Sequence, residues 1–352
     1  MPRKFIILLI FLISFTSACS ALAYNETTLT LPAGAQSPLS EWFQVYFSDP
    51  GGANSQTQRG GPDAILAEAI RDAHASIDIA IYDLNLWNIR DALLDAQRNG
   101  VVVRMVVESD NLDRNEFQDL IEAGIPVLGD RHEAFMHNKF IVIDRYQVWT
   151  GSMNMTLNGA YHNDNNLVQI NSTQLAENYL VEFEEMFTED LFGNESPSNT
   201  PNPHIELNGT PIETYFSPDD GVQSQIVNLI NNAQESVYFM AFAFTADPIS
   251  LALLNADARG LDVSGVIERG QSNNMGSDYQ ALVNAGLNVI LDSNPKNMHH
   301  KVIIIDEQII ITGSYNFSRA AEERNDENVL ILYNSEIAEI YLEEFDNVFG
   351  SK

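Results

Sequence analysis

The chain has 352 residues, a formal net charge of -31 and one cysteine, with 45% hydrophobic and 19% charged residues. One cysteine excludes a small disulfide-stabilised scaffold, and the apolar content excludes general disorder. The length allows two domains with hydrophobic cores, and after the N-terminus no uncharged apolar run approaches the roughly 20 residues of a membrane-spanning helix.

The first 23 residues have the pattern of an export signal. Basic residues at Arg3 and Lys4 precede an apolar run over residues 5–15, and small residues end the segment at 21–23. We therefore expect a signal peptide over residues 1–23 and a secreted or extracytoplasmic protein. The residues before Cys19 also resemble a bacterial lipobox, so a lipid anchor through Cys19 is the alternative.

The remaining chain contains an internal repeat of one domain-sized unit. Residues 75–82 match residues 235–242 at an offset of 160, and from residue 123 onward the offset is 162. In each half a short segment is followed by a helical stretch, an apolar strand, a second helix, a second strand and a hairpin. Strands that alternate with helices indicate an α/β fold, and we predict a mixed sheet flanked by helices in each half.

The halves are separated by residues rich in proline and small polar side chains. Residues 196–203 contain three prolines, which disfavour a helix or a central strand. We predict a first lobe over residues 24–195, a proline-rich linker over 196–211 and a second lobe over 212–352.

The closest match between the halves is a polar motif, H-x-K-x4-D-x6-G-S-x-N. Its members are His137, Lys139, Asp144, Gly151, Ser152 and Asn154 in the first half, and His299, Lys301, Asp306, Gly313, Ser314 and Asn316 in the second. With residue frequencies of about 5%, six fixed positions coincide roughly once in 10^8 trials, so chance does not explain two copies.

The spacing predicts how these side chains point. His and Lys two residues apart, at the start of the buried runs 140–143 and 302–305, project from one face of a strand toward the same ligand. We expect Asp144 and Asp306 to have structural roles at turns, and the glycines to allow close backbone approach.

Two ammonium groups and several neutral donors that converge on one point form an anion site, and tetrahedral phosphate fits it. Cleavage of a phosphodiester also needs a nucleophile and a proton for the departing alkoxide. Two imidazoles, one neutral and one protonated, can supply both. This chemistry requires no metal ion.

The doubled motif resembles that of the phospholipase D superfamily, and the resemblance extends from about Tyr46 to Phe349. It implies two α/β lobes related by a pseudo-twofold axis, one active site at their interface, a phosphohistidine intermediate and no cofactor. By this resemblance one of His137 and His299 is the nucleophile and the other is the acid. The same resemblance assigns phosphate binding to Lys139, Lys301, Asn154 and Asn316, assisted by Ser152 and Ser314.

The family also places a carboxylate that orients a catalytic histidine downstream of the motif. Glu327 lies at that position in the second half, and Asn165 replaces it in the first. With Glu327 as the partner of His299, a carboxylate would favour the protonated imidazole. We therefore assign attack to His137 and protonation of the leaving group to His299. The reverse assignment is the alternative, because a carboxylate also makes a histidine more nucleophilic.

Other polar residues are less specific. Arg131 and His132 precede the first motif and could line the pocket, whereas His300 faces away from His299 and is expected in packing or solvent. Glu108 and Glu268 occupy equivalent strand ends, where a pocket role and a buried structural role are both open. Residues 84–87 form either a core edge or an apolar lip for lipid.

The leading hypothesis is an exported phosphodiesterase that hydrolyses phospholipid head groups to phosphatidic acid, with transient contact to a membrane surface. An endonuclease of the same superfamily is the alternative, although the negative charge makes nucleic acid less expected as a partner. A phosphate-binding module without activity is the third hypothesis. Both motifs lie in one chain, so we expect a monomer to hold a complete site.

Overall fold

The structure, a computed structural model, describes residues 39–350, all of which belong to one unit of the chain. The predicted signal peptide and Cys19 lie outside the described residues. Among residues 39–350, no helix has both the length and the apolar character needed to cross a membrane.

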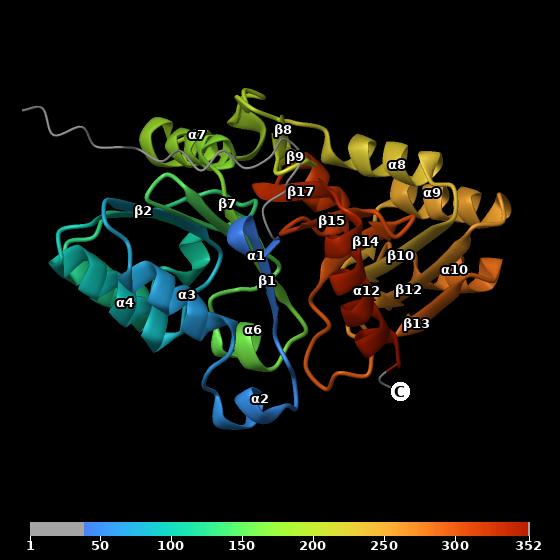
Figure 1. The fold of residues 1–352 in the computed structure, drawn as a ribbon, viewed down its shortest axis with the longest axis horizontal. Helices are drawn as coiled ribbons and strands as arrows, with labels where there is room; N and C mark the ends of the chain where they lie inside the picture. The colour runs from blue at the N-terminus through green and yellow to red at the C-terminus, as the bar shows by residue number, and fades with distance from the viewer. Residues whose placement is uncertain (1–38, 351–352) are drawn as a thin grey trace, which may run out of the picture. The chain divides into compact units, whose positions relative to one another are not determined.

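The first half, coloured from blue to green in Figure 1, contains one seven-stranded sheet and its helices. The strands are β1 (Phe43–Phe47), β2 (Ser76–Ile81), β3 (Val102–Val107), β4 (Val127–Gly129), β5 (Lys139–Ile143), β6 (Gln147–Gly151) and β7 (Asn166–Asn171). The helices are α1 (Leu39–Trp42), α2 (Ala53–Thr57), α3 (Pro62–Arg71), α4 (Trp87–Arg98), α5 (Asn115–Glu122), α6 (Leu157–Tyr161) and α7 (Thr173–Glu189), and short 3-10 helices span Ser109–Asn111 and Gly193–Glu195. The strand order is β1-β7-β6-β5-β2-β3-β4.

The second half, from yellow to red, contains an eight-stranded sheet. Its strands are β8 (His204–Leu207), β9 (Thr210–Ser217), β10 (Ser236–Ala241), β12 (Asp262–Ile267), β13 (Asn288–Leu291), β14 (Lys301–Ile305), β15 (Ile309–Gly313) and β17 (Glu327–Tyr333), and β11 (Phe244–Thr245) pairs separately with β16 (Phe317–Ser318). The helices are α8 (Val222–Asn232), α9 (Asp247–Ala258), α10 (Tyr279–Ala285), α11 (Arg319–Glu323) and α12 (Ser335–Gly350).

The order of the second sheet, β13-β12-β10-β14-β15-β17-β9-β8, repeats that of the first and adds β8 at the edge. In each sheet three strands run parallel, β2-β3-β4 and β10-β12-β13, and the others are antiparallel. The predicted fold of two mixed sheets flanked by helices is confirmed.

The predicted linker over residues 196–211 is shorter in the structure. Strand β8 begins at His204, and β9 begins at Thr210. The two residues between them, Asn208 and Gly209, have φ values of 51° and 77°, as a two-residue hairpin loop of the primed type requires. The Asn-Gly pair was the sequence signal for this hairpin, and the stretch of the predicted linker before it that lies outside helices and strands is residues 196–203.

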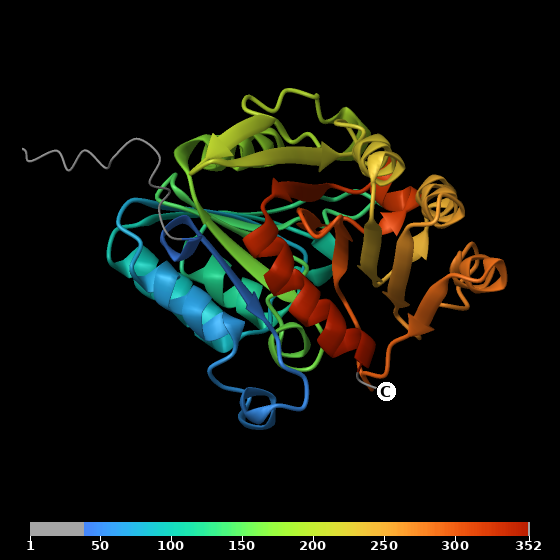
Figure 2. The same cartoon turned by 45° about the vertical axis from the view of Figure 1, so that its right-hand side comes forward.

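The two halves share a core as well as having cores of their own. Helices α7 and α12 contribute Tyr179, Phe183 and Tyr341 to a buried cluster that also includes Phe140 of the first sheet and Ile304 of the second. Figure 2 shows α12 crossing between the halves. Burying a large apolar side chain contributes roughly 1.5–3 kcal/mol, so this shared cluster holds the two motif-bearing strands in a fixed relation.

Candidate active site

The two motifs begin at central strands of the two sheets. Lys139 is the first residue of β5 and pairs with Ile81, and Lys301 is the first residue of β14 and pairs with Ala241. The runs that follow are apolar and fully buried, as expected for strands covered on both faces. Each strand therefore presents its lysine, and the histidine two residues earlier, at the same end of its sheet.

The motif aspartates lie at the opposite end of these strands. The Asp144 carboxylate accepts hydrogen bonds from the backbone N–H groups of residues 74–76, and the Asp306 carboxylate accepts them from residues 234–236. Both carboxylates therefore fix the start of β2 or β10 rather than reaching the histidines, which is a structural role.

The motif glycines allow two strands to approach closely. A Cβ atom at Gly151 would lie 2.5 Å from the backbone oxygen of Asn166, and one at Gly313 would lie 2.2 Å from that of Asn328. Any side chain would push β6 from β7, or β15 from β17, and would displace the serine that follows. The predicted reason for glycine at these positions is confirmed.

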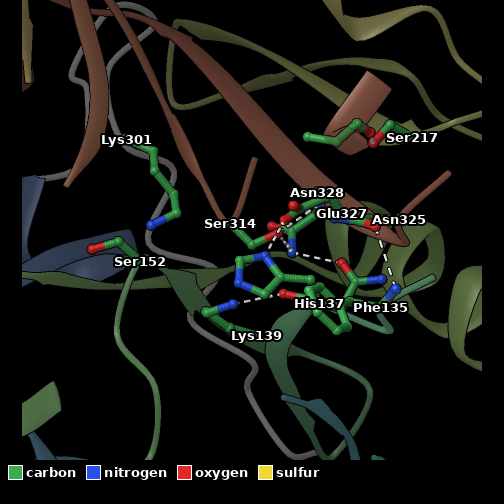
Figure 3. Close-up of polar contacts among 12 residues, drawn as sticks. Phe135, His137, Lys139, Ser152, Ser217, Lys301, Ser314, Asn325, Glu327 and Asn328 are labelled. Carbon is green, nitrogen blue, oxygen red and sulfur yellow. Dashed lines mark hydrogen bonds and ion pairs between the residues drawn. The ribbon is translucent and has the colours of Figure 1, made fainter. Parts of the chain in front are cut away.

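Each motif histidine is held by residues of the opposite half. Nδ1 of His137 lies 2.7 Å from Oε2 of Glu327, and Nδ1 of His299 lies 2.9 Å from Oδ1 of Asn165. The backbone N–H of His137 donates to the oxygen of Asp326, and that of His299 to Asp164. The two motifs thus meet at the interface between the halves, and Figure 3 shows His137 beside Glu327.

This crossing corrects one sequence-based prediction. Glu327 was expected to be the partner of His299, but it contacts His137, and Asn165 contacts His299. The cause is an exchange of segments across the interface, where Met136 bridges to Asp326 and Asp164 bridges to Met298. Spacing along the chain places Glu327 near its own motif and carries no information about this exchange.

The partners also fix the tautomer of each imidazole. A carboxylate accepts from His137, and Oδ1 of Asn165 accepts from His299, so Nδ1 carries the hydrogen in both rings. The orientation of the Asn165 amide is set because its Nδ2 donates to the oxygen of Gly159 and its Oδ1 accepts from Ser152. Nε2 is therefore the reactive nitrogen of both histidines.

Buried positive charge dominates the electrostatics. Burial, Lys139 and Lys301 lower the pKa of the His137 imidazole well below its ordinary value, and the same causes lower the pKa of His299. Burial lowers the pKa of Lys139 to about 7 and that of Lys301 well below its ordinary value. Burial raises the pKa of Glu327 to about 7, against the opposing effect of Lys139. A bound anion would raise the pKa of both histidines and both lysines and so favour their protonated forms.

The lysines come from different halves, and Figure 3 shows the Lys139 side chain beside His137. Nζ of Lys139 donates to the backbone oxygen of His137 at 2.7 Å, and Nζ of Lys301 donates to that of His299 at 2.9 Å. Nζ of Lys301 also lies 3.4 Å from Nε2 of His299. Each ammonium group is thus anchored on the backbone of the histidine of its own motif, and that of Lys301 also lies beside the reactive nitrogen of His299.

The motif serines and the motif asparagines have different surroundings. The Ser152 hydroxyl donates to Asn165, and Ser314 hydrogen-bonds Glu327, so both serines position the partners of the histidines. Asn154 and Asn316 are only partly buried, and Oδ1 of each has no hydrogen-bond partner among the described residues. An amide oxygen is an acceptor, so binding of phosphate by the Nδ2 groups of these two residues stays a prediction.

Two aromatic residues complete the site and were missed in the sequence. The Tyr82 ring lies 5.1 Å from the His137 ring and 5.4 Å from Nζ of Lys139. The Phe242 ring lies 4.5 Å from the His299 ring and 5.1 Å from Nζ of Lys301. They follow β2 and β10 at equivalent positions of the repeat, a signal that could have identified them.

Other polar residues do not join this site. Arg131 pairs with Asp190 and His132 packs on Phe192, so neither contacts the catalytic histidines. His300 is fully buried, with Nε2 2.9 Å from Oε1 of Glu344, in agreement with its predicted packing role. Within residues 39–350, no three His, Cys, Asp or Glu side chains are grouped as a metal site.

Comparison with known proteins agrees with this geometry. The profile of the family described as "Cardiolipin synthase, PLD-like domain" matches residues 66–187 and 226–349, which is more than half of the chain. The chain belongs to the phospholipase D superfamily and is a phosphodiesterase of that type.

Individual relatives match one part of the chain or its whole fold. A phospholipase D of Rickettsia conorii is 40% identical over 142 residues, 40% of this chain and 71% of that protein. The human mitochondrial cardiolipin hydrolase is 33% identical over 36% of this chain and 50% of its own length. The crystal structure of a phosphatidylserine synthase from Haemophilus influenzae has a TM-score of 0.63 at 14% identity and covers 88% of this chain and 86% of that chain, which shows a common fold.

Proposed function

We propose that this phosphodiesterase is an exported enzyme that hydrolyses phospholipid head groups to phosphatidic acid through a phosphohistidine intermediate. The observation that carries the proposal is the unequal partnering of two histidines beside two buried lysines, Glu327 on His137 and Asn165 on His299. The relatives named phospholipase D support a phospholipid substrate.

His137 is the nucleophile in this proposal. Its Nε2 lone pair forms the bond to phosphorus, and the bond from phosphorus to the head-group oxygen breaks. The ring, with Nδ1–H retained and Nε2 phosphorylated, carries a positive charge, which the Glu327 carboxylate at 2.7 Å stabilises directly. The assignment made from sequence is thus retained, on the opposite pairing and for a different reason.

His299 is the acid. It donates the Nε2 proton to the departing alkoxide and becomes neutral, and an amide partner favours this step because it does not stabilise the cation as a carboxylate would. In the second step the neutral ring takes a proton from water, the water oxygen bonds to phosphorus, and the bond to Nε2 of His137 breaks. Lys139, Lys301 and the amides of Asn154 and Asn316 hold the non-bridging oxygens.

A feature of the first half supports lipid as the substrate. Leu84 and Leu86 are buried, as a core edge requires, but Trp87 is 67% exposed and Leu157 is 36% exposed. Both line a cavity of about 860 Å³. The equivalent positions of the second half hold Asp247 and Arg319, so these two apolar side chains have no apolar counterpart there, and they are suited to transient contact with a membrane surface.

The test separates lipid from nucleic acid. Mature protein in chelator is incubated with phosphatidylcholine or cardiolipin vesicles and, in parallel, with single-stranded DNA or RNA, and each assay is repeated with His137→Ala. Head-group release that the substitution abolishes is the expected result. Cleavage of nucleic acid without lipid turnover would replace the proposal with an endonuclease, and turnover of neither would favour a binding module.

The same preparation tests the proposed monomer. One chain carries both motifs, and each histidine is partnered within that chain. Activity per chain should therefore be constant on dilution through the range in which any dimer dissociates. Activity that appears only in the dimer fraction of a sizing column would contradict this.

A further inference from the structure

Two buried glutamates lie next to the site without contacting its imidazole rings. Glu108 and Glu268 directly follow β3 and β12, at equivalent positions of the repeat, and their exposed fractions are 1% and 3%. Within residues 39–350, neither has an ion pair with Lys or Arg. Burial raises the pKa of both carboxyl groups to about 7, so keeping a carboxylate at these places costs stability.

Each carboxylate joins two loops. Oε2 of Glu108 accepts from the backbone N–H of Met136 at 3.1 Å, and its Oε1 accepts from Asp110 at 3.2 Å. Oε2 of Glu268 accepts from Met298 at 2.7 Å, and its Oε1 accepts from Gly270 at 2.8 Å. Bonds from backbone amides to a carboxylate are about twice as strong as neutral ones.

Two of the backbone N–H groups that donate to these glutamates belong to the residues immediately before the catalytic histidines. Met136 precedes His137, whose own N–H donates to Asp326, and Met298 precedes His299, whose N–H donates to Asp164. Two successive amides of each loop are thus fixed, one by a glutamate of its own half and the next by the backbone of the other half. The glutamates therefore set where the histidine backbone lies relative to its partner across the interface.

We propose that Glu108 and Glu268 are positioning residues of the reaction, Glu108 for the nucleophile His137 and Glu268 for the acid His299. The roles of the two histidines rest on the proposed function. Misplacement of a reacting group by about 1 Å can cost about 10²-fold in rate, so loss of either glutamate affects one chemical step more than the other.

The experiment compares Glu108→Ala and Glu268→Ala on two soluble diesters, one with a p-nitrophenyl leaving group and one with an alkyl leaving group. p-Nitrophenolate departs without a proton, whereas an alkoxide needs the acid. Glu108→Ala should lower the rate of the first chemical step by about 10²-fold with both diesters. Glu268→Ala should lower the rate of that step by about 10²-fold with the alkyl diester and by less than about 3-fold with the aryl diester. The rate is measured as the first turnover after rapid mixing, because steady-state turnover of both diesters also contains the second step, in which His299 is the base.

Matched controls separate positioning from general stability. Glu108→Gln and Glu268→Gln keep a carbonyl acceptor for the Met136 or Met298 amide and should recover most of the lost rate, and they remain informative if an alanine variant does not fold. Asp144→Ala and Asp306→Ala also remove backbone-amide acceptors from β-strand ends, but far from the histidines. They should lower the melting temperature without a difference between the two diesters.

Equal losses with both diesters in Glu268→Ala, or a loss of stability alone as in Asp144→Ala, would overturn the proposal. If Glu108→Ala slowed only the alkyl diester and Glu268→Ala slowed both diesters, the assignment of each glutamate to its step would be overturned. The soluble diesters also keep this test separate from the lipid proposal, because wild-type turnover of aryl diesters without turnover of phospholipid would remove only the latter.

Discussion

The two halves of the chain have the same strand order and the same motif, and they differ where each histidine finds its partner. His137 is paired with a carboxylate, Glu327, and His299 with an amide, Asn165. A duplicated scaffold alone would give two equal imidazoles. The difference in one functional group across the interface is what favours a cation on one ring and its loss from the other.

The halves also differ at the residue between the motif histidine and lysine. Asn138 in the first half is replaced by His300 in the second, yet both belong to equivalent buried networks. Asn328 donates to Asn138, and Asn166 lies 3.3 Å from His300. Neither Asn138 nor His300 is bonded to a catalytic imidazole, so this replacement alters packing at the interface, and the proposed division of roles rests on Glu327 and Asn165.

The largest expected effect comes from removing either histidine. His137→Ala should lower kcat by at least about 10^4-fold with aryl and alkyl diesters alike, because no nucleophile remains. His299→Ala should slow the first chemical step comparably with alkyl diesters only, and it should lower steady-state turnover of both diesters because His299 is also the base of the second step. The first-turnover release of each leaving group measures the first step, and equal losses of that rate for both variants on the aryl diester would contradict distinct roles.

The next effect concerns the carboxylate. Glu327→Gln keeps an acceptor for Nδ1 of His137 but removes the charge that stabilises the phosphorylated ring. We expect kcat to fall by about 10²- to 10^4-fold, as for loss of the carboxylate in other histidine-dependent sites. Pre-steady-state kinetics should show slower formation of the intermediate. A change below about 5-fold would show that an amide serves His137 equally well.

A smaller effect is expected when His299, like His137, has a carboxylate partner. Asn165→Asp places a carboxylate at Nδ1 of His299, where burial and the lysines hold the pKa low. An added anion favours the cation, so the pKa of His299 should rise. The acid must be protonated to act, and the basic limb of kcat/KM against pH should therefore move upward by about 1–3 units. A downward shift would contradict the acid role.

The smallest effect on activity is expected at the far end of the motif strand. Asp144→Ala leaves the backbone N–H groups of residues 74–76 without their carboxylate and should lower the free energy of unfolding by about 1–3 kcal/mol. The kcat of the folded protein should stay within about 2-fold of wild type. Denaturant unfolding and activity at 20 °C, with Asp306→Ala as the matched variant, measure the two quantities.

The repeat and the β-branched runs were sufficient to predict the mixed sheets, and the spacing of His and Lys predicted which ends of β5 and β14 carry the site. Local patterns failed where the structure depends on the interface. The pairing of Glu327 with His137 arises from segments that cross between halves, and the core shared by α7 and α12 depends on tertiary packing. The Asn208-Gly209 hairpin was different, since its signal was present in the sequence.

The central claim is that the carboxylate-paired histidine attacks phosphorus and the amide-paired histidine donates the proton. Rapid quenching of the enzyme with a p-nitrophenyl diester, followed by peptide mapping at alkaline pH, locates the phosphorylated residue. We predict phosphate on His137, with a reduced amount in Glu327→Gln. Phosphate on His299, with His137 unmodified, would contradict the account.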